Sequence, residues 1–137
     1  MQHHIRSMNL KLQMNEILEI ENDCYADPWT KKTFYHCLQQ KTVSGVVIER
    51  QGRIAGYLIY EKFGSLYKIV NLTVATEFQR SGLGAELVNF LKKLTVCREI
   101  EMIVSDRCLS AHLFMASQQF RAVKVARNFF DVDGFQE

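Results

Sequence analysis

The sequence contains few of the residues that mark linkers between domains, and few that form disulfides or metal sites. Its 137 residues include one proline and seven glycines, with no low-complexity linker and no internal repeat, so we expect a single domain spanning residues 1–137. The four cysteines contain no Cys-x-x-Cys pair and no histidine cluster beside them, which excludes the common zinc-site patterns. We therefore expect no metal site, and reduced cysteines in a cytoplasmic protein.

Long apolar runs and an excess of one charge are also missing. No run approaches the ~20 residues of a membrane span, and the start, MQHHIRSMNL, has no apolar region of the secretory kind. Lys and Arg total 17 against 15 Asp and Glu, for a net charge of +2. A nucleic-acid-binding surface would need a basic stripe. We expect neither a membrane nor a nucleic-acid partner, and 47% hydrophobic residues suffice for a globular core.

What the sequence does contain is a series of strands and helices in a readable order. Period-2 and period-3.6 patterns, with turn and cap residues between them, predict each element. In chain order we expect a short strand within 5–12, a helix over 15–25, a helix capped by Thr30, strands at 43–50, 54–63 and 65–74, a helix over 83–94, a strand at 99–104, a helix over 109–118 and a strand within 120–130. A helix between two strands of one sheet makes those strands parallel. The fold class is therefore α/β, with a mixed, mostly antiparallel central sheet and helices on both faces.

The stretch FQRSGLG places two glycines, Gly82 and Gly84, where the helix over 83–94 begins. Taken alone, such a pair often does no more than allow a tight turn and close packing. A P-loop would need Gly-Lys-Ser or Gly-Lys-Thr at its end, whereas Ala85 and Glu86 follow here. A dinucleotide fingerprint would need a third glycine and a glycine directly after the strand, and both are missing.

A pyrophosphate cradle explains the stretch better. Gln79 to Gly84 fits the pattern Gln/Arg-x-x-Gly-x-Gly/Ala. The first N–H groups of a helix have no intrahelical partner, and the helix dipole adds partial positive charge there. Glycines let a diphosphate approach those N–H groups closely, with no metal required.

The motif, the preceding strand IVNLTV and the order of elements resemble the GNAT N-acetyltransferase family over nearly the whole chain. DPWTKKTF, residues 27–34, and ARNFF, residues 126–130, resemble one branch, the ribosomal-protein alanine N-acetyltransferases, which acetylate protein N-termini. Asp27 stands where that branch usually has an aromatic residue. The resemblance implies acetyl-CoA as the donor, a protein or peptide N-terminal α-amine as the acceptor, and direct attack without a metal.

The resemblance also implies which residues contact acetyl-CoA. Backbone groups of one strand would follow the pantetheine and thioester, and the glycine loop would hold the pyrophosphate. A parting between the NLTV strand and the EIEMIV strand would admit the molecule. These cofactor-binding residues are Leu72, Thr73, Val74, Gln79, Arg80, Ser81, Gly82, Leu83, Gly84, Ala85 and Cys108.

Three positions that carry chemistry in the family are altered here. Ile103 stands where a glutamate or histidine base is expected, Met115 where a tyrosine acid is expected, and Cys108 where a cofactor-contacting asparagine is expected. The catalytic residues are therefore unknown from the sequence. Other polar side chains in plausible segments are better explained by packing, turns and surface positions: Tyr57, Tyr60, Glu61, Tyr67, Ser105, Asp106 and His112. We also expect the family's last strand to be absent, which would leave a sheet edge open to a homodimer.

A missing base matters less for some acceptors than for others. A free α-amino group has a pKa near 7.7–8.0, so about a tenth of it is neutral at pH 7, whereas a lysine amine with a pKa near 10.4 is almost fully charged. We therefore expect slow transfer to an α-amine. The alternatives are a CoA-binding module with little or no turnover, and an acetyltransferase for small-molecule amines.

Overall fold

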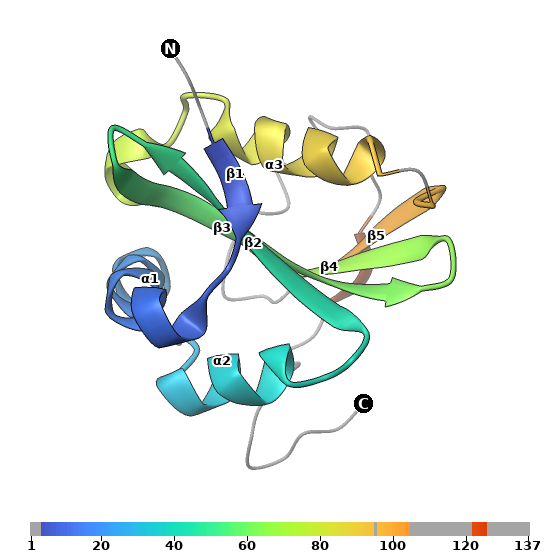
Figure 1. Cartoon of the computed structure of the whole chain (residues 1–137), viewed down its shortest axis with the longest axis horizontal. Helices are drawn as coiled ribbons and strands as arrows, with labels where there is room; N and C mark the ends of the chain where they lie inside the picture. The colour runs from blue at the N-terminus through green and yellow to red at the C-terminus, as the bar shows by residue number, and fades with distance from the viewer. Residues whose placement is uncertain (1–3, 95, 105–121, 126–137) are drawn as a thin grey trace.

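The computed structural model describes residues 4–94, 96–104 and 122–125 and contains a six-stranded sheet in the order β1-β2-β3-β4-β5-β6 (Figure 1). The elements are β1 His4–Ser7, α1 Leu10–Cys24, α2 Lys31–Leu38, β2 Val43–Arg50, β3 Arg53–Phe63, β4 Leu66–Val74, a 3-10 turn Thr76–Phe78, α3 Leu83–Lys92, β5 Glu99–Val104 and β6 Ala122–Val125.

The first four strands pair antiparallel and the last pairings are parallel, which confirms the predicted mixed sheet. β2 and β3 join through a tight turn at Gln51 and Gly52, whose φ angles of 57° and 77° are both positive, as a two-residue hairpin requires. β4 pairs antiparallel with β3 and parallel with β5. α3 connects these two strands, so it is a crossover helix.

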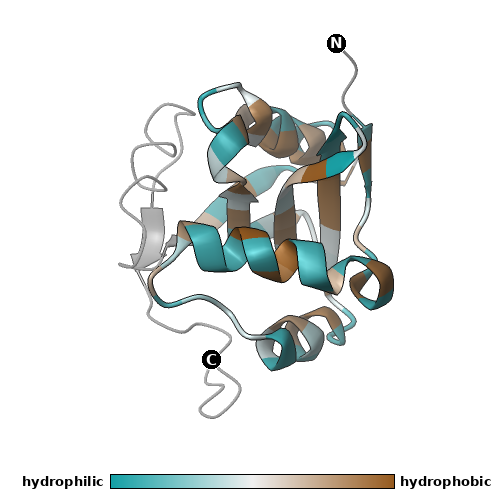
Figure 2. Cartoon of the chain, turned by 90° about the vertical axis from the view of Figure 1, so that its left-hand side faces the viewer, coloured by the Kyte–Doolittle hydropathy of each residue, from teal (hydrophilic) through white to brown (hydrophobic). Residues whose placement is uncertain are grey.

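Helices cover both faces of the sheet. In Figure 1, α1 and α2 lie on one side of the strands and α3 lies on the other. Figure 2 shows the hydrophobic residues of the strands lying between helices whose outer surfaces are hydrophilic. The predicted stripe of α3 is confirmed, with Leu83, Leu87, Val88 and Leu91 all buried.

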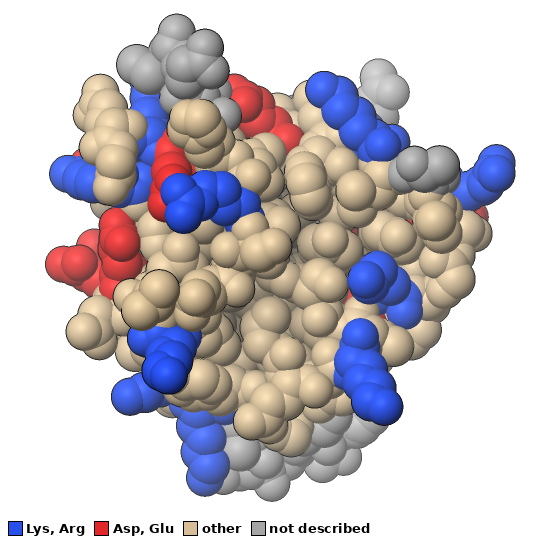
Figure 3. Space-filling view, viewed as in Figure 1, with Lys and Arg blue, Asp and Glu red and all other residues tan. Residues whose placement is uncertain are grey.

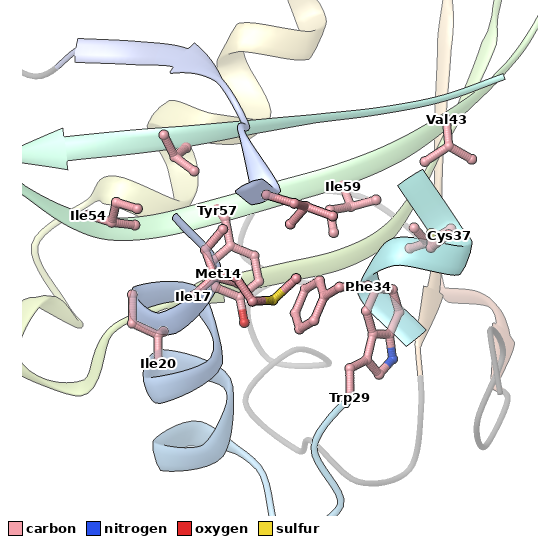
Figure 4. Close-up of a cluster of buried hydrophobic side chains, with 13 residues drawn as sticks. Met14, Ile17, Ile20, Trp29, Phe34, Cys37, Val43, Ile54, Tyr57 and Ile59 are labelled. Carbon is pink, nitrogen blue, oxygen red and sulfur yellow. The ribbon is translucent and has the colours of Figure 1, made fainter. Parts of the chain in front are cut away.

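The core beneath α1 and α2 is built around aromatic rings. Phe34 of α2 makes edge-to-face contacts with Trp29, at 5.1 Å between ring centroids, and with Tyr57, at 5.9 Å. In Figure 4, Tyr57 points from β3 toward Ile17 of α1. Aromatic side chains bury large areas, so this cluster fixes the α1–α2 connection against the sheet.

A bulge in β4 reverses which side chains face each layer. Ile59 pairs with Asn71 and Tyr60 pairs with Ile69, so Val70 is an extra residue. Before the bulge, Ile69 packs in the α3 core. After it, Asn71 and Thr73 contact α1 and its following loop. Because side chains alternate along a strand, one inserted residue exchanges the two faces for the rest of β4.

The start of α1 differs from the prediction, which placed it at Asn15. The helix begins at Leu10 because Asn9 caps it: the Asn9 side chain accepts a hydrogen bond from the Leu12 N–H at 3.2 Å. The Gln13 side chain accepts from the Asn9 N–H at 2.7 Å, a reciprocal cap. Apolar periodicity alone missed this turn because Lys11 and Leu12 are exposed.

The helix expected over 109–118 and most of the strand expected within 120–130 lie outside the described residues, as does the end of the chain. Among the helices that the structure describes, none has the length and apolar character needed to cross a membrane. Lys and Arg side chains form separate groups on the face drawn in Figure 3 and do not merge into a continuous stripe.

Candidate functional site

The first N–H groups of α3 have no backbone acceptor among the described residues. Its first intrahelical bond runs from the Glu86 N–H to the Gly82 carbonyl at 3.1 Å, so the N–H groups of Leu83, Gly84 and Ala85 have no partner within the helix. Asn9 and Thr30 cap the other two helices with their side chains, whereas the α3 cap residue is Gly82, which has none. This end of α3 can therefore bind an anion through main-chain donors.

The loop before α3 has an unusual backbone that keeps this end open. Arg80 and Gly82 have φ angles of 63° and 86°, a conformation that is uncommon for a side chain such as that of Arg80. A Cβ at Gly82 would meet no atom within 4 Å. The Ser81 hydroxyl donates to the Phe78 carbonyl, and Arg80 and Ser81 are exposed. The described residues therefore leave the space beside the Gly82 Cα open.

The second part of the candidate site is the edge of β4 beyond its last contact with β5. Pairing between the strands ends at Ile69 and Met102, although β4 continues to Val74 and β5 to Val104. Past that point β5 pairs with β6. Among the described residues the strands therefore part where the resemblance predicted, and we call residues 71–74, which have no strand partner on this side in the described part of the chain, the open edge of β4.

Side chains, and not β5, bind the carbonyl groups of the open edge. The Leu72 carbonyl accepts a hydrogen bond from the Tyr25 hydroxyl at 3.2 Å. The Val74 carbonyl accepts from Gln79 Nε2 at 2.9 Å and lies 3.3 Å from Cys24 Sγ. Gln79 thus joins the glycine loop to the open edge, so the two halves of the candidate site are adjacent.

The structure brings most of the predicted cofactor-binding residues together. Leu72, Thr73 and Val74 lie on the open edge, and residues 79–85 form the loop and helix end beside it. Ile103 lies in β5, where its register partner is Lys124 of β6. Cys108 and Met115 lie outside the described residues. The roles assigned to all of these residues remain predictions.

Sequence reasoning missed a buried polar cluster next to the open edge. Glu21 of α1 is fully buried. Its carboxylate accepts hydrogen bonds from the Tyr57 hydroxyl at 2.5 Å, the Trp29 N–H at 2.8 Å and Asn71 Nδ2 at 3.2 Å. Burial, followed by the negative charge of Glu21, raises the pKa of Tyr57 well above its ordinary value. The sequence held a signal, because Glu21 interrupts the apolar face that the prediction assigned to this helix.

The other tyrosines considered from the sequence have packing roles. Tyr60 and Tyr67 stack with 5.7 Å between ring centroids, in the core beneath α3. Glu61 accepts a hydrogen bond from the Thr42 hydroxyl at 2.8 Å. Within the part of the chain that the structure describes, no three His, Cys, Asp or Glu side chains gather as a metal site would need.

Comparison with known proteins identifies the family. The model of the acetyltransferase (GNAT) family matches residues 14–116, which include the glycine loop and the whole of β4. The chain belongs to this family. The family uses acetyl-CoA. The N–H groups at the mouth of α3 and the open edge of β4 fit that molecule's diphosphate and its extended amide chain.

The named relatives agree with the branch predicted from the sequence. The chain is 31% identical over 96 residues to a Bacillus subtilis (strain 168) protein named "Putative ribosomal protein bS18-alanine N-acetyltransferase", covering 69% of this chain and 62% of that protein. The chain thus spans less than two thirds of this relative's length.

Solved structures share the fold. The ribosomal-protein-S18-alanine N-acetyltransferase from Escherichia coli matches with a TM-score of 0.76 at 23% identity, over 93% of this chain and 83% of that one. The ribosomal-protein-alanine N-acetyltransferase from Brucella melitensis biovar Abortus 2308 matches with a TM-score of 0.71 at 13% identity, over 92% of this chain and 96% of that one.

Proposed function

We propose that the protein transfers an acetyl group from acetyl-CoA to the N-terminal α-amine of a protein or peptide, such as a ribosomal protein. The observation that carries this proposal is the pairing of an uncapped helix N-terminus with an open strand edge. Gln79 links the two through its 2.9 Å bond to the Val74 carbonyl. The names of the relatives support the α-amine acceptor.

The chain's own residues would bind and orient the donor. The N–H groups of Leu83, Gly84 and Ala85 would hold the diphosphate, with Arg80 adding charge at the rim. The open edge of β4 would align the extended part of the molecule in the manner of an added strand. When bound, acetyl-CoA supplies an activated thioester, and orientation of the two reactants supplies much of the remaining rate enhancement.

The acceptor class follows from the acid–base chemistry. At the position where the resemblance predicts a base the chain has Ile103, which cannot accept a proton. An α-amine is about one tenth neutral at pH 7 and can attack without prior deprotonation, whereas a lysine amine is neutral to only about one part in a few thousand. Transfer to an α-amine is therefore the reaction that these residues support.

Because Ile103 cannot act as a base, a second candidate function is a CoA-binding module with little turnover. Release of free CoA distinguishes the two. Purified protein is incubated with acetyl-CoA and a panel of peptides with free N-termini, N-terminally blocked peptides with an internal lysine, and polyamines. We expect release with free N-termini only.

Two other outcomes would overturn this proposal. Acetyl-CoA binding by calorimetry without release from any acceptor would establish the binding module. Modification of internal lysines or polyamines in preference to free N-termini would replace the proposed acceptor.

A further inference from the structure

The turn between β2 and β3 places two arginines beside the segment that leads into α3. Arg50 and Arg53 are register partners that close this hairpin. The Arg53 guanidinium forms an ion pair with the Glu77 carboxylate, and Glu77 lies in the 3-10 turn that precedes the glycine loop. In Figure 1 the turn between β2 and β3 accordingly lies next to the segment before α3. The hairpin and the approach to the candidate diphosphate site are therefore neighbours.

Both guanidinium groups lie over one aromatic ring, that of Phe78. The Arg50 and Arg53 Cζ atoms are 5.7 Å and 5.3 Å from the ring centroid, within the range of cation–π attraction. The Phe78 side chain packs against the core beneath α3. The Phe78 carbonyl accepts a hydrogen bond from the hydroxyl of Ser81, which stands two residues before the start of α3. Phe78 thus holds both positive charges close to the mouth of α3.

These two positive charges are only partly balanced by carboxylates. Arg53 and Glu77 are both more than half exposed, where an ion pair contributes little. None of the ion pairs among the described residues includes Arg50, and Arg50 Nε is buried without a hydrogen-bond acceptor in that part of the chain. The neighbouring acid, Glu49, pairs with Arg6. Because a buried donor of a charged group costs free energy without an acceptor, this corner is suited to an anion from outside the chain.

The donor of the proposed function carries such an anion. Coenzyme A has a phosphomonoester on the 3′-hydroxyl of its ribose, in addition to the diphosphate that the mouth of α3 would bind. The ribose is bonded directly to the diphosphate, so the monoester lies within one sugar of the start of α3. A phosphomonoester has a charge of about −1.5 to −2 at neutral pH, and the planar fork of an arginine matches the oxygens of a phosphate.

We propose that Arg50 and Arg53 form a second phosphate site, which binds the 3′-phosphate of acetyl-CoA while the mouth of α3 binds the diphosphate. This inference rests on the proposed function. Arg50 donates through N–H groups that have no acceptor in the described chain, and Arg53 donates through those that Glu77 does not occupy. The consequence is donor selectivity: the protein uses complete coenzyme A and disfavours acetyl donors that lack the 3′-phosphate, such as acetyl-dephospho-CoA.

Acetyl-CoA and acetyl-dephospho-CoA test this site, because they differ only in the 3′-phosphate. Calorimetry gives the Kd of each donor for the wild type, Arg50→Gln and Arg53→Gln. We expect the wild type to bind acetyl-CoA about 100-fold more tightly than the dephospho compound, as two hydrogen-bonding contacts to a charged group would give. Each substitution should lower this ratio to about 10-fold by weakening the binding of acetyl-CoA alone. Added sodium chloride should also lower the wild-type ratio, because salt screens the charges.

Arg98→Gln is the matched control. Arg98 is exposed, and its N–H donates to the Ser65 carbonyl at 2.8 Å, just before β4 begins, whereas Phe78 follows the other end of that strand. The substitution changes the net charge equally, away from the proposed site, and should leave the ratio unchanged. Thermal unfolding of each variant identifies any loss of fold. Arg50→Lys keeps the charge without the planar fork and should retain part of the preference.

The inference is overturned if the wild type binds the two donors with the same Kd. It is also overturned if Arg50→Gln and Arg53→Gln weaken both donors equally, because the arginines would then act through the packing of Phe78. A ratio that falls as far in Arg98→Gln as in Arg50→Gln would show that net charge alone carries the preference. A wild type that binds neither donor would instead refute the proposed function.

Discussion

At the scale of single residues, Gly56 sets how closely β3 and β4 approach beside the candidate site. A Cβ built on Gly56 would lie 2.7 Å from the Thr73 carbonyl oxygen and 3.3 Å from the Val74 Cα. Both are main-chain atoms, which cannot move aside without shifting the strand. Thr73, whose carbonyl Gly56 approaches, also donates a hydrogen bond to Asn71 Oδ1 at 2.7 Å.

Gly56→Ala should therefore lower the free energy of unfolding by about 1–3 kcal/mol, the usual cost of overpacking. Urea unfolding followed by circular dichroism measures this. Gly45→Ala is the control, because its Cβ would meet the side chains of Met8 and Leu38 at 3.1–3.3 Å, and side chains can adjust. An equal loss in both variants would contradict the account of Gly56.

The residues of the glycine loop were predictable from the sequence because their pattern is local. Gly82 and Gly84 occur within a few positions of each other, and the helix stripe that follows places them at its start. Glu21, Tyr25 and Thr73 were not predictable as a group, because the contacts join residues about 50 positions apart and depend on the bulge at Val70. No pattern in one segment encodes that extra residue.

At the scale of elements, the three helices within the described residues begin in two different ways. Asn9 caps α1 and Thr30 caps α2, where the Thr30 hydroxyl oxygen accepts a hydrogen bond from the Thr33 N–H at 3.2 Å. α3 begins at Gly82 without a side-chain cap. The capped helices are structural supports, whereas the uncapped end is the one that we assign to ligand binding.

Thr30→Ala should destabilise the protein by about 1 kcal/mol, because the Thr33 N–H loses its acceptor. The change appears as a lower midpoint in urea. Thr30→Ser keeps the hydroxyl and should cost much less, so a similar loss in both variants would show that the methyl group, and not the cap, carries the effect.

The positions of helices and strands could be predicted where the sequence contains a recognisable cap or turn residue. Thr30 predicted the start of α2, and Gln51 with Gly52 predicted the hairpin turn. The start of α1 was misplaced by five residues because the exposed first turn breaks the apolar pattern. The cap of Asn9 was a sequence signal that the periodicity argument did not use.

At the scale of the whole molecule, the sheet separates two cores, one beneath α1 and α2 and one beneath α3. The mixed sheet and the parallel β4–β5 pair were predicted because connection rules limit the choices, whereas the positions of β1 and β6 in the sheet were not predicted. We propose that residues 1–137 form one domain that unfolds cooperatively. Trp29, the single tryptophan, lies in the first core and can report on it by fluorescence.

Stability should fall at alkaline pH. Cys37 is fully buried, and burial, followed by the charge of Glu61, raises the pKa of its thiol above the ordinary value of 9.0. The unfolded chain therefore loses this proton above pH 9 while the folded chain keeps it. This contribution is complete below pH 9 and is lost as pH rises, with a slope of about 1.4 kcal/mol per pH unit for one group.

Tyr57 should also lower the free energy of unfolding as the pH rises above 10.0, because its pKa in the folded chain is raised above that ordinary value. Urea unfolding between pH 8 and pH 11, followed by Trp29 fluorescence, measures both contributions. In Cys37→Ala the decline should start about one pH unit later. A free energy of unfolding that stays constant from pH 9 to pH 11 would contradict the burial of both groups.

The extra residue in β4 makes that strand tolerant of a deletion at one position. Deleting Val70 would leave Ile59 opposite Asn71 and Tyr60 opposite Ile69, so Asn71 and Thr73 would keep facing Glu21 and Ile69 would stay in the core beneath α3. The cost would be the loss of the buried Val70 side chain from the first core. Deleting Leu72, which lies beyond the bulge, would instead reverse the face of Thr73, because side chains alternate along a strand. The same strand can therefore lose a codon at one site without changing its two faces, but not at another site two residues away.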